Sequence, residues 1–338
     1  MRVVSCLTLI TWLSVSAAGQ PPASPAAKVD ASQVLAAARE VLGGEARLAG
    51  VKTFVATGRT RQVRGDNLLP IEFEIVCELP DRFVRKDEIP AQESGPTSTG
   101  FNGEDLIQLP VPSAPPAGGP PRGAPPAGAP GGAPAGGPPG APGRGPQGPP
   151  PAARTAAVKQ DFARLTLGMF AASFPSYPLT FTHAGLAEAP QGEADVLDVQ
   201  GPGNFSLRYF VDRKTHLPIM VSWTVPVTNV IVAIPGQPAP TAPPGAIVVD
   251  APPPPAAAAS KEEQDAYGQA VAGLRKKALA EAKPIEHRVY YSDYRAVDGL
   301  QFPFRLRRAV AGQTIEETAF DRFRINTKID PRRFEVRK

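Results

Sequence analysis

The sequence predicts an α+β fold that is mostly antiparallel β, with one strongly curved sheet whose apolar side is covered by a few helices. Strand-like segments are many and are joined mostly by short turns, whereas helical segments are few. Several strand-like segments also alternate apolar and charged residues, which is typical of a sheet with one face in water. We expect one domain over residues 28–338, because the blocks between the Pro-rich inserts are too short to fold separately.

Residues 1–18 have the features of a secretory signal peptide. Arg2 supplies a positive start, an apolar run follows over residues 3–13, and residues 16–18 are the small residues of a cleavage site. The run is shorter than the ~18–20 residues that span a bilayer. We therefore expect cleavage near Ala18 and a mature protein in the periplasm or otherwise exported. Cys77 is then the remaining cysteine, so an internal disulfide is excluded.

Two helices are expected to cover the sheet. Residues 32–42 place apolar side chains at helical spacing after Asp30 or Ser32, either of which can cap the start, and two glycines follow. Residues 156–173 carry a similar apolar stripe, and the sequence Phe174-Pro175 ends that helix.

Strands are expected where apolar residues alternate with polar residues between turn signals. In the first of them, Phe73, Ile75 and Cys77 alternate with glutamates and Val76 on the opposite, wet face. The expected strands are residues 71–79, 83–86, 105–109, 194–200, 205–211, 218–225, 285–295, 300–310 and 314–325.

Two segments rich in Pro, Gly and Ala interrupt this pattern, at about 110–153 and 235–259. The glycines of the first keep no three-residue phase, which excludes a collagen helix. Segments of this composition have few large apolar side chains to offset the entropy of ordering, so we expect both to be disordered. Residues 260–283 follow as a polar helix outside the sheet, opened by a Ser260 and Glu263 capping box.

Several motifs, taken in order, resemble the outer-membrane lipoprotein-sorting (LolA/LolB-like) superfamily. They are PDRFVR at 80–85, DRKTHLP at 212–218, YSDYRAVDGLQFPF at 291–304 and the ending at 325–334. The resemblance implies an unclosed β half-barrel, lidded by helices, whose concave side holds acyl chains or another lipid-like ligand. It also implies that a strand arginine holds the lid, and Arg82 and Arg85 are the candidates.

The apolar faces of the strands and of the second helix are the candidate hydrophobic groove. The alternative is that they pack as a dry core, because a pocket and a core use the same side chains and differ only by an unfilled volume. The groove candidates are Phe73, Ile75, Phe83, Phe162, Leu165, Met169, Leu207, Tyr209, Trp223, Phe302 and Phe304.

Motifs of catalysis and metal binding are lacking in the sequence. It contains no G-x-S-x-G elbow, no S-x-x-K and no phosphate loop. His183, His216 and His287 have no second ligand at zinc-site spacing. We therefore expect no catalytic residues, no metal and no cofactor, and a protein that is not an enzyme.

Basic residues gather at 305–308 and towards the C-terminus, although the formal net charge of the whole chain is only +4. These side chains face water on strands, or they attract an anionic membrane surface. Nucleic acid is not expected, because no aromatic platform lies among the arginines.

The function predicted from the sequence is that of an exported, monomeric envelope protein that binds or carries a hydrophobic ligand, such as the acyl chains of a lipoprotein. The alternative is an envelope scaffold that acts through its Pro-rich inserts.

Overall fold

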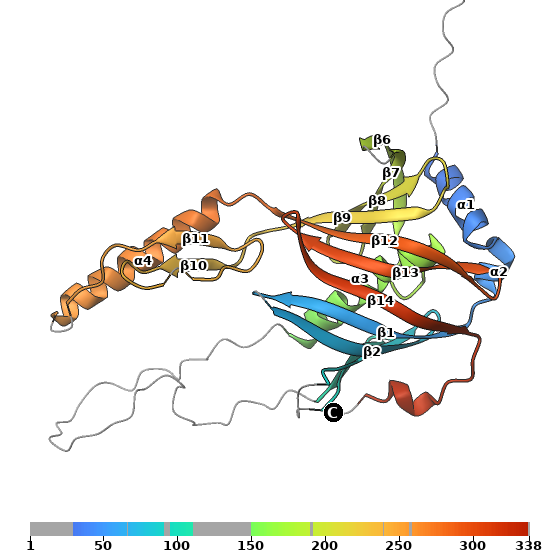
Figure 1. Ribbon diagram of the computed structural model, residues 1–338, viewed down its shortest axis with the longest axis horizontal. Coiled ribbons are helices and arrows are strands. Elements are labelled where there is room, and N and C mark those ends of the chain that lie inside the picture. Colours follow the sequence, from blue (N-terminus) through green and yellow to red (C-terminus); the bar gives the residue numbers. More distant parts are fainter. Residues whose placement is uncertain are drawn as a thin grey trace, which may run out of the picture.

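A sheet of twelve antiparallel strands forms most of the computed structural model, which describes residues 30–65, 67–90, 95–110, 150–189, 192–238, 240–256 and 259–336 (Figure 1). The strand order is β5-β4-β3-β2-β1-β14-β13-β12-β9-β8-β7-β6, so β5 and β6 are unpaired edges and the sheet is unclosed. The strands are β1 (Thr53–Arg64), β2 (Asn67–Glu78), β3 (Arg82–Glu88), β4 (Thr97–Asn102), β5 (Asp105–Leu109), β6 (Thr180–Ala189), β7 (Gly192–Gly201), β8 (Phe205–Asp212), β9 (Pro218–Val225), β12 (Ile285–Val297), β13 (Leu300–Val310) and β14 (Gln313–Ile325).

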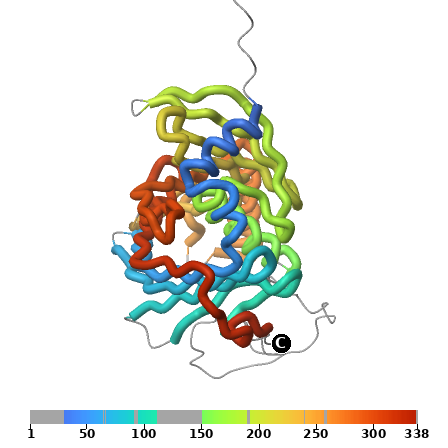
Figure 2. The backbone as a smooth tube through the Cα atoms, turned by 90° about the vertical axis from the view of Figure 1, so that its right-hand side faces the viewer, coloured from blue at the N-terminus to red at the C-terminus, as the bar shows by residue number. Residues whose placement is uncertain are grey.

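The sheet wraps around helix α3 (Pro151–Phe170), and helix α1 (Ala31–Leu42) lies beside it (Figure 2). Helix α3 contacts β4 and β5 at one edge of the sheet and β9 and β13 in the other half. The short helix α2 (Glu45–Ala49) follows α1. These features confirm the predicted fold class, a strongly curved antiparallel half-barrel covered by a few helices.

Helix α1 begins and ends where its sequence signals predict. The Asp30 side chain accepts hydrogen bonds at the N-terminus and forms a capping box with Gln33. Gly43 ends the helix with φ +134°, and a Cβ atom there would lie 2.5 Å from the Leu300 side chain. Only glycine combines this backbone conformation with such a close approach to the sheet.

Helix α3 starts earlier than expected, at Pro151 rather than at residue 156, because proline is compatible with the first turn of a helix. Strands β1, β4 and β6 have no counterpart among the expected strands. In β1 a bulge follows Thr57, and in β6 another lies between His183 and Gly185. Each bulge breaks the alternation on which strand prediction depends.

An arm, residues 226–284, projects from the sheet between β9 and β12 (Figure 1). It contains the parallel strands β10 (Val230–Ala233) and β11 (Ile247–Asp250) and helix α4 (Lys261–Glu281), whose Ser260 capping box is present and none of whose residues is buried. The outer position predicted for this polar helix is therefore confirmed.

The expectation of disorder throughout residues 235–259 is wrong at β11. The β-branched run Ile247-Val248-Val249 pairs in register with β10, which outweighs the prolines on either side. In the first insert, residues 111–149 lie outside the described residues, and so does the signal-peptide segment 1–18. No helix in the described ranges has both the length and the apolar character needed to cross a membrane.

The 3-10 helix η1 (Pro331–Phe334) covers a second, smaller core on the outer face of the sheet. Phe334 packs there with Val55, Val76, Val84 and Ile107. Val76 was expected on the wet face, and that expectation is wrong because η1 folds over it. The Arg333 guanidinium pairs with the Glu74 carboxylate, and this contact lowers the pKa of Glu74.

Substitution of Phe302 can test the packing of the inner core. Its ring is fully buried and lies 4.8 Å from the Phe323 ring and 5.9 Å from the Phe170 ring. We expect Phe302→Ala to lower the free energy of unfolding by about 3–5 kcal/mol, measured by urea denaturation. Leu68→Ala is the control, because Leu68 is 61% exposed. Similar small losses for both variants would contradict this description of the core.

Candidate functional site

The concave side of the sheet is filled by side chains rather than open. Every groove candidate named from the sequence is buried in one continuous core except Leu165, which is partly buried against it. In this arrangement these side chains pack as a core together with apolar residues of α1.

Two phenylalanines of α3 reach different parts of the sheet. The Phe162 ring lies 5.3 Å from both Phe83 on β3 and Phe101 on β4. The Phe170 ring lies 6.1 Å from Phe54 on β1 and 5.9 Å from Phe302 on β13. Phe162, just past the middle of α3, thus covers the strands near one edge, and the last turn of the helix fills the centre of the half-barrel.

Three tyrosine hydroxyls from the sheet hold the C-terminal half of α3, and we call Tyr209, Tyr291 and Tyr294 the tyrosine anchor. Tyr209 donates to the Leu167 carbonyl at 3.0 Å, and Tyr294 lies 2.8 Å from the Gly168 carbonyl. Tyr291 donates to the Arg164 carbonyl. The Leu167 carbonyl also accepts from the Ala171 N–H at 3.2 Å, whereas Gly168 lies among the last four residues of α3, whose carbonyls lack helical partners.

Burial raises the pKa of all three anchor tyrosines, so the phenols stay protonated and remain donors. Gly168 allows the close approach of helix and sheet, because a Cβ atom there would lie 2.4–2.9 Å from atoms of the Tyr291 ring. The anchor therefore fixes one end of α3.

The opposite end of α3 is held at the edge strands β4 and β5. Arg154 donates to the Gln108 side chain at 2.7 Å, and Lys159 pairs with Glu104 at 2.6 Å. The Glu104 side chain is 92% exposed, so the carboxylate of this ion pair is in contact with water. The Lys159 side chain is buried, and its Nζ atom lies 5.6 Å from the centre of the Phe101 ring. This end of α3 is therefore attached through its side chains, whereas the anchor bonds to the backbone of the other end.

The two arginines predicted to contact a lid bond to strand residues in the described structure. Arg82 pairs with Glu78 at 3.1 Å. Arg85 pairs with Asp87 at 2.7 Å and donates to Thr60 at 3.2 Å. A contact of either arginine with a helix stays a prediction.

Four side chains meet at the rim of the concave side, near the arm, and we call Arg164, Trp223, His287 and Arg308 the rim cluster. The Arg164 Cζ atom lies 4.1 Å from the centre of the Trp223 ring, and the His287 ring stacks on the same tryptophan at 5.3 Å. Burial lowers the pKa of His287, and the charges of Arg308 and Arg164 lower it further.

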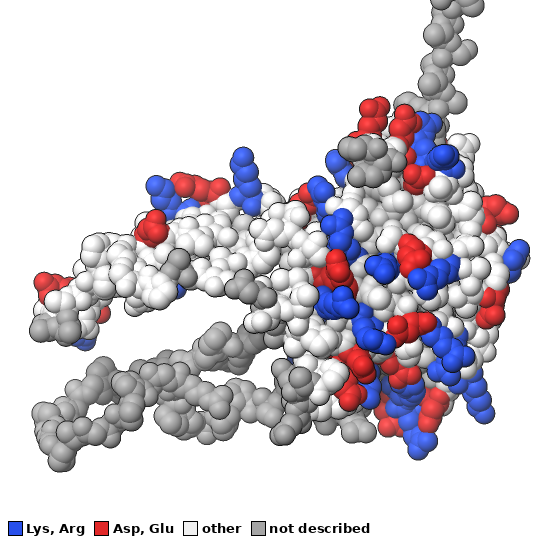
Figure 3. Space-filling model, viewed as in Figure 1, with Lys and Arg blue, Asp and Glu red and all other residues white. Residues whose placement is uncertain are grey.

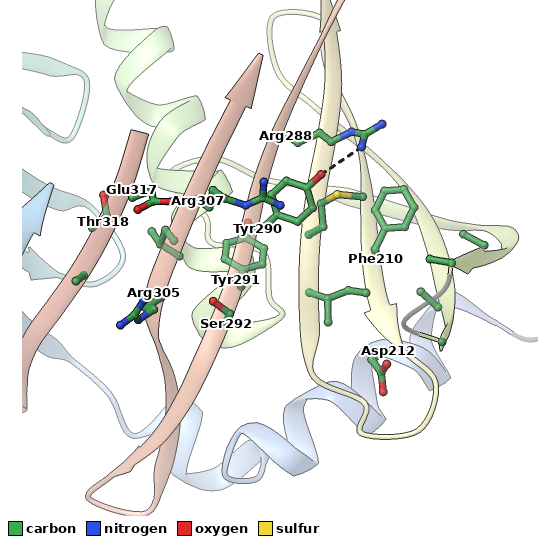
Figure 4. Close-up of a pocket in the computed structure, with 18 of the residues that line it drawn as sticks. Phe210, Asp212, Arg288, Tyr290, Tyr291, Ser292, Arg305, Arg307, Glu317 and Thr318 are labelled. Carbon is green, nitrogen blue, oxygen red and sulfur yellow. Dashed lines mark hydrogen bonds between the residues drawn. The ribbon is translucent and has the colours of Figure 1, made fainter. Parts of the chain in front are cut away.

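The outer face of the sheet carries a hollow of about 1040 Å³ that the sequence analysis did not predict (Figure 4). Phe210, Met220 and Tyr290 lie in it, and the Arg307 guanidinium stacks on Tyr290 at 4.0 Å. Adjacent aromatic pairs such as Tyr290-Tyr291 signal an apolar residue on each face of a strand, and that signal could have indicated the hollow.

Charges of both signs are interspersed over the face of the molecule seen in Figure 3. Arg305 lies 3.7 Å from Asp293, and Arg59 lies 3.7 Å from Asp321. Such paired charges do not make a uniformly positive surface, so attraction to an anionic membrane stays a prediction. Among the described residues, no three His, Cys, Asp or Glu side chains are grouped closely enough to hold a metal ion.

No protein-family model and no curated protein matches the sequence. Among solved structures, the chain is similar to a LolA superfamily protein from Nitrosomonas europaea, with 10% identity, a TM-score of 0.45, and coverage of 91% of this chain and 98% of that one. It is also similar to a DUF1329 family protein from Desulfovibrio piger, with 7% identity, a TM-score of 0.39, and coverage of 90% and 96%.

A third similar structure, from Vibrio parahaemolyticus, is described as an outer membrane lipoprotein-sorting protein domain, with 8% identity, a TM-score of 0.40, and coverage of 90% and 96%. The first and third structures carry the name of the superfamily that the sequence motifs resemble. We draw no ligand or function from these likenesses, because every TM-score among the three is below 0.5.

The tyrosine anchor can be tested by removing single hydroxyls. We expect Tyr209→Phe and Tyr294→Phe each to lower the free energy of unfolding by about 1 kcal/mol, because a hydrogen bond between the sheet and α3 is lost. Amide hydrogens of α3 should exchange faster in both variants. Tyr290→Phe, on the outer face, is the matched control. Exchange in α3 that equals the control would show that the hydroxyls do not hold the helix.

The pH dependence of stability should include a contribution from His287. Because its folded pKa lies below the ordinary value of 6.5, the unfolded chain binds the proton more readily. Stability is therefore complete above pH 6.5 and decreases as the pH falls through the interval down to the folded pKa. Denaturation at stepped pH should show a shallower decrease for His287→Gln, but not for the exposed control His216→Asn.

Proposed function

We propose that the protein is an exported envelope protein that binds or carries a hydrophobic ligand, such as an acyl chain or the acyl groups of a lipoprotein, without covalent chemistry. The ligand lies between the part of α3 up to Phe162 and strands β2–β4. The groove candidates in this region are Phe73, Ile75, Phe83 and Phe162.

The observation that supports this proposal most is the unequal attachment of α3. Its last turn is buried, and the tyrosine anchor holds it. The part of α3 up to Phe162 is fixed at the sheet edge by Phe162 and by the Arg154 and Lys159 contacts. A swing of this part about the anchor uncovers the rings of Phe83 and Phe101 and leaves the rest of the core in place.

The energetics are compatible with such an exchange. Each methylene of an acyl chain removed from water contributes roughly 0.8 kcal/mol, so a long chain can replace the contacts that Phe162 loses. Release follows when Phe162 returns to the same apolar surface. In this scheme α3 and the ligand compete for one face of the sheet, and no reacting group is required.

The arm favours a second function, that of an envelope scaffold. It projects from the sheet, and none of the residues of α4 is buried (Figure 1). The scaffold function predicts partner binding that is lost on deletion of the arm or of residues 111–149, with no lipid bound at any stage.

Lipid extraction from the purified mature protein tests the carrier function directly. We expect native mass spectrometry to show co-purified lipid, and a photoreactive fatty acid to crosslink to β2–β4 and α3 rather than to the outer hollow. Lys159→Ala should accelerate uptake, because it releases the end of α3 that is attached through side chains. Arg213→Ala is the matched control, since it removes another ion pair, at 2.7 Å from Glu193. An absence of lipid together with an absence of crosslinks would overturn the proposal.

A further inference from the structure

The rim cluster brings two arginines and a histidine together from three elements: Arg164 from α3, His287 from β12 and Arg308 from β13. Trp223 lies between Arg164 and His287, contacting both. In the register of β12 and β13, Arg308 faces Val289, two residues from His287. The charge of Arg308 lowers the pKa values of both Arg164 and His287, which is consistent with this proximity.

Acidic compensation for these charges is poor within the described part of the chain. Arg164 pairs with Asp161 at 2.8 Å, but the Asp161 side chain is 60% exposed. Arg308 is half-buried and has no hydrogen bond or ion pair to any described residue. Glu316 is its register partner on β14, yet no ion pair joins the two side chains. The positive charge of Arg308 is therefore not neutralised by any described neighbour.

Three nitrogen atoms of the rim cluster are buried and have no hydrogen-bond partner among the described residues: Nε of Arg164, Nε of Arg308 and Nδ1 of His287. A buried donor without a partner costs free energy, and an arginine without an anion costs more. Such groups are rare in folded proteins and call for an explanation, of which a missing ligand is one. Guanidinium groups are also the side chains best suited to bind carboxylates and phosphates.

We propose that the rim cluster binds the anionic headgroup, a carboxylate or a phosphate, of an amphiphile whose acyl chain lies under α3. This inference rests on the proposed function and adds the class of ligand: an anionic amphiphile rather than a neutral lipid. Because Arg164 lies on α3 and Arg308 lies on β13, a bound headgroup bridges the helix and the sheet. Half-buried Arg308 and His287 leave the site accessible at the rim.

The test compares palmitate with hexadecanol, which share chain length and differ in charge, on the full mature chain. We expect the wild-type protein to bind palmitate roughly tenfold more tightly, as one charge-assisted hydrogen bond provides. In Arg308→Gln that preference should vanish. The matched control is Arg305→Gln on the same strand, whose side chain is 70% exposed on the outer face; it should keep the preference.

A second measurement separates a ligand-binding arginine from a structural one. Without any amphiphile, Arg308→Gln should not lower the thermal midpoint, because it removes a charge that no described group compensates. A clear loss of thermal stability in this variant would overturn the inference by showing that Arg308 supports the fold.

The remaining outcomes distinguish this inference from the proposed function. Equal binding of palmitate and hexadecanol by the wild type overturns the headgroup site and leaves the carrier function standing. Stabilisation of the wild type, but not of Arg308→Gln, by inorganic phosphate with no binding of either amphiphile overturns the carrier function and assigns the cluster to a free anion.

Discussion

The packing of α3 against both halves of the sheet is the contact on which the structure depends. The edge strands β5 and β6 do not pair with each other, so no hydrogen bonds close the barrel among the described strands. Phe162 and Phe170 fill the enclosed space instead, each meeting rings from different strands. The curvature of the sheet and the position of α3 therefore depend on each other, since the apolar face of the sheet and that of α3 are buried only against one another.

The same contact relates stability to function. Apolar surface that a ligand would use is surface that α3 already buries, so binding must exchange one set of contacts for another rather than add a new set. The tyrosine anchor limits this exchange to one end of the helix, because its hydroxyls bond to carbonyls near the last turn. At the other end, the edge strands hold α3 through side chains, which include Gln108, Glu104 and the Phe101 ring.

Much of the fold could be predicted from local sequence, and most of the site could not. Regular alternation revealed β8, β12 and β13, whereas the bulges after Thr57 and His183 concealed β1 and β6. The groove candidates of the strands and of α3 lie in or against one core, but local sequence does not show whether the two sets enclose space between them. Tyr294 bonds to a carbonyl 126 residues away, and no local pattern encodes such a pair.

The arm leaves the sheet at β9 and returns at β12, which are hydrogen-bonded neighbours. Tension applied to the arm is therefore borne by the pairs at the end of these two strands, starting with Val225 and Ile285. The pair that follows two positions further is Trp223 and His287. A partner that pulls on the arm would thus separate the residue pairs of these two strands one after another. A mechanical load on α4 would in this way reach the stacked rings of Trp223 and His287 at the rim.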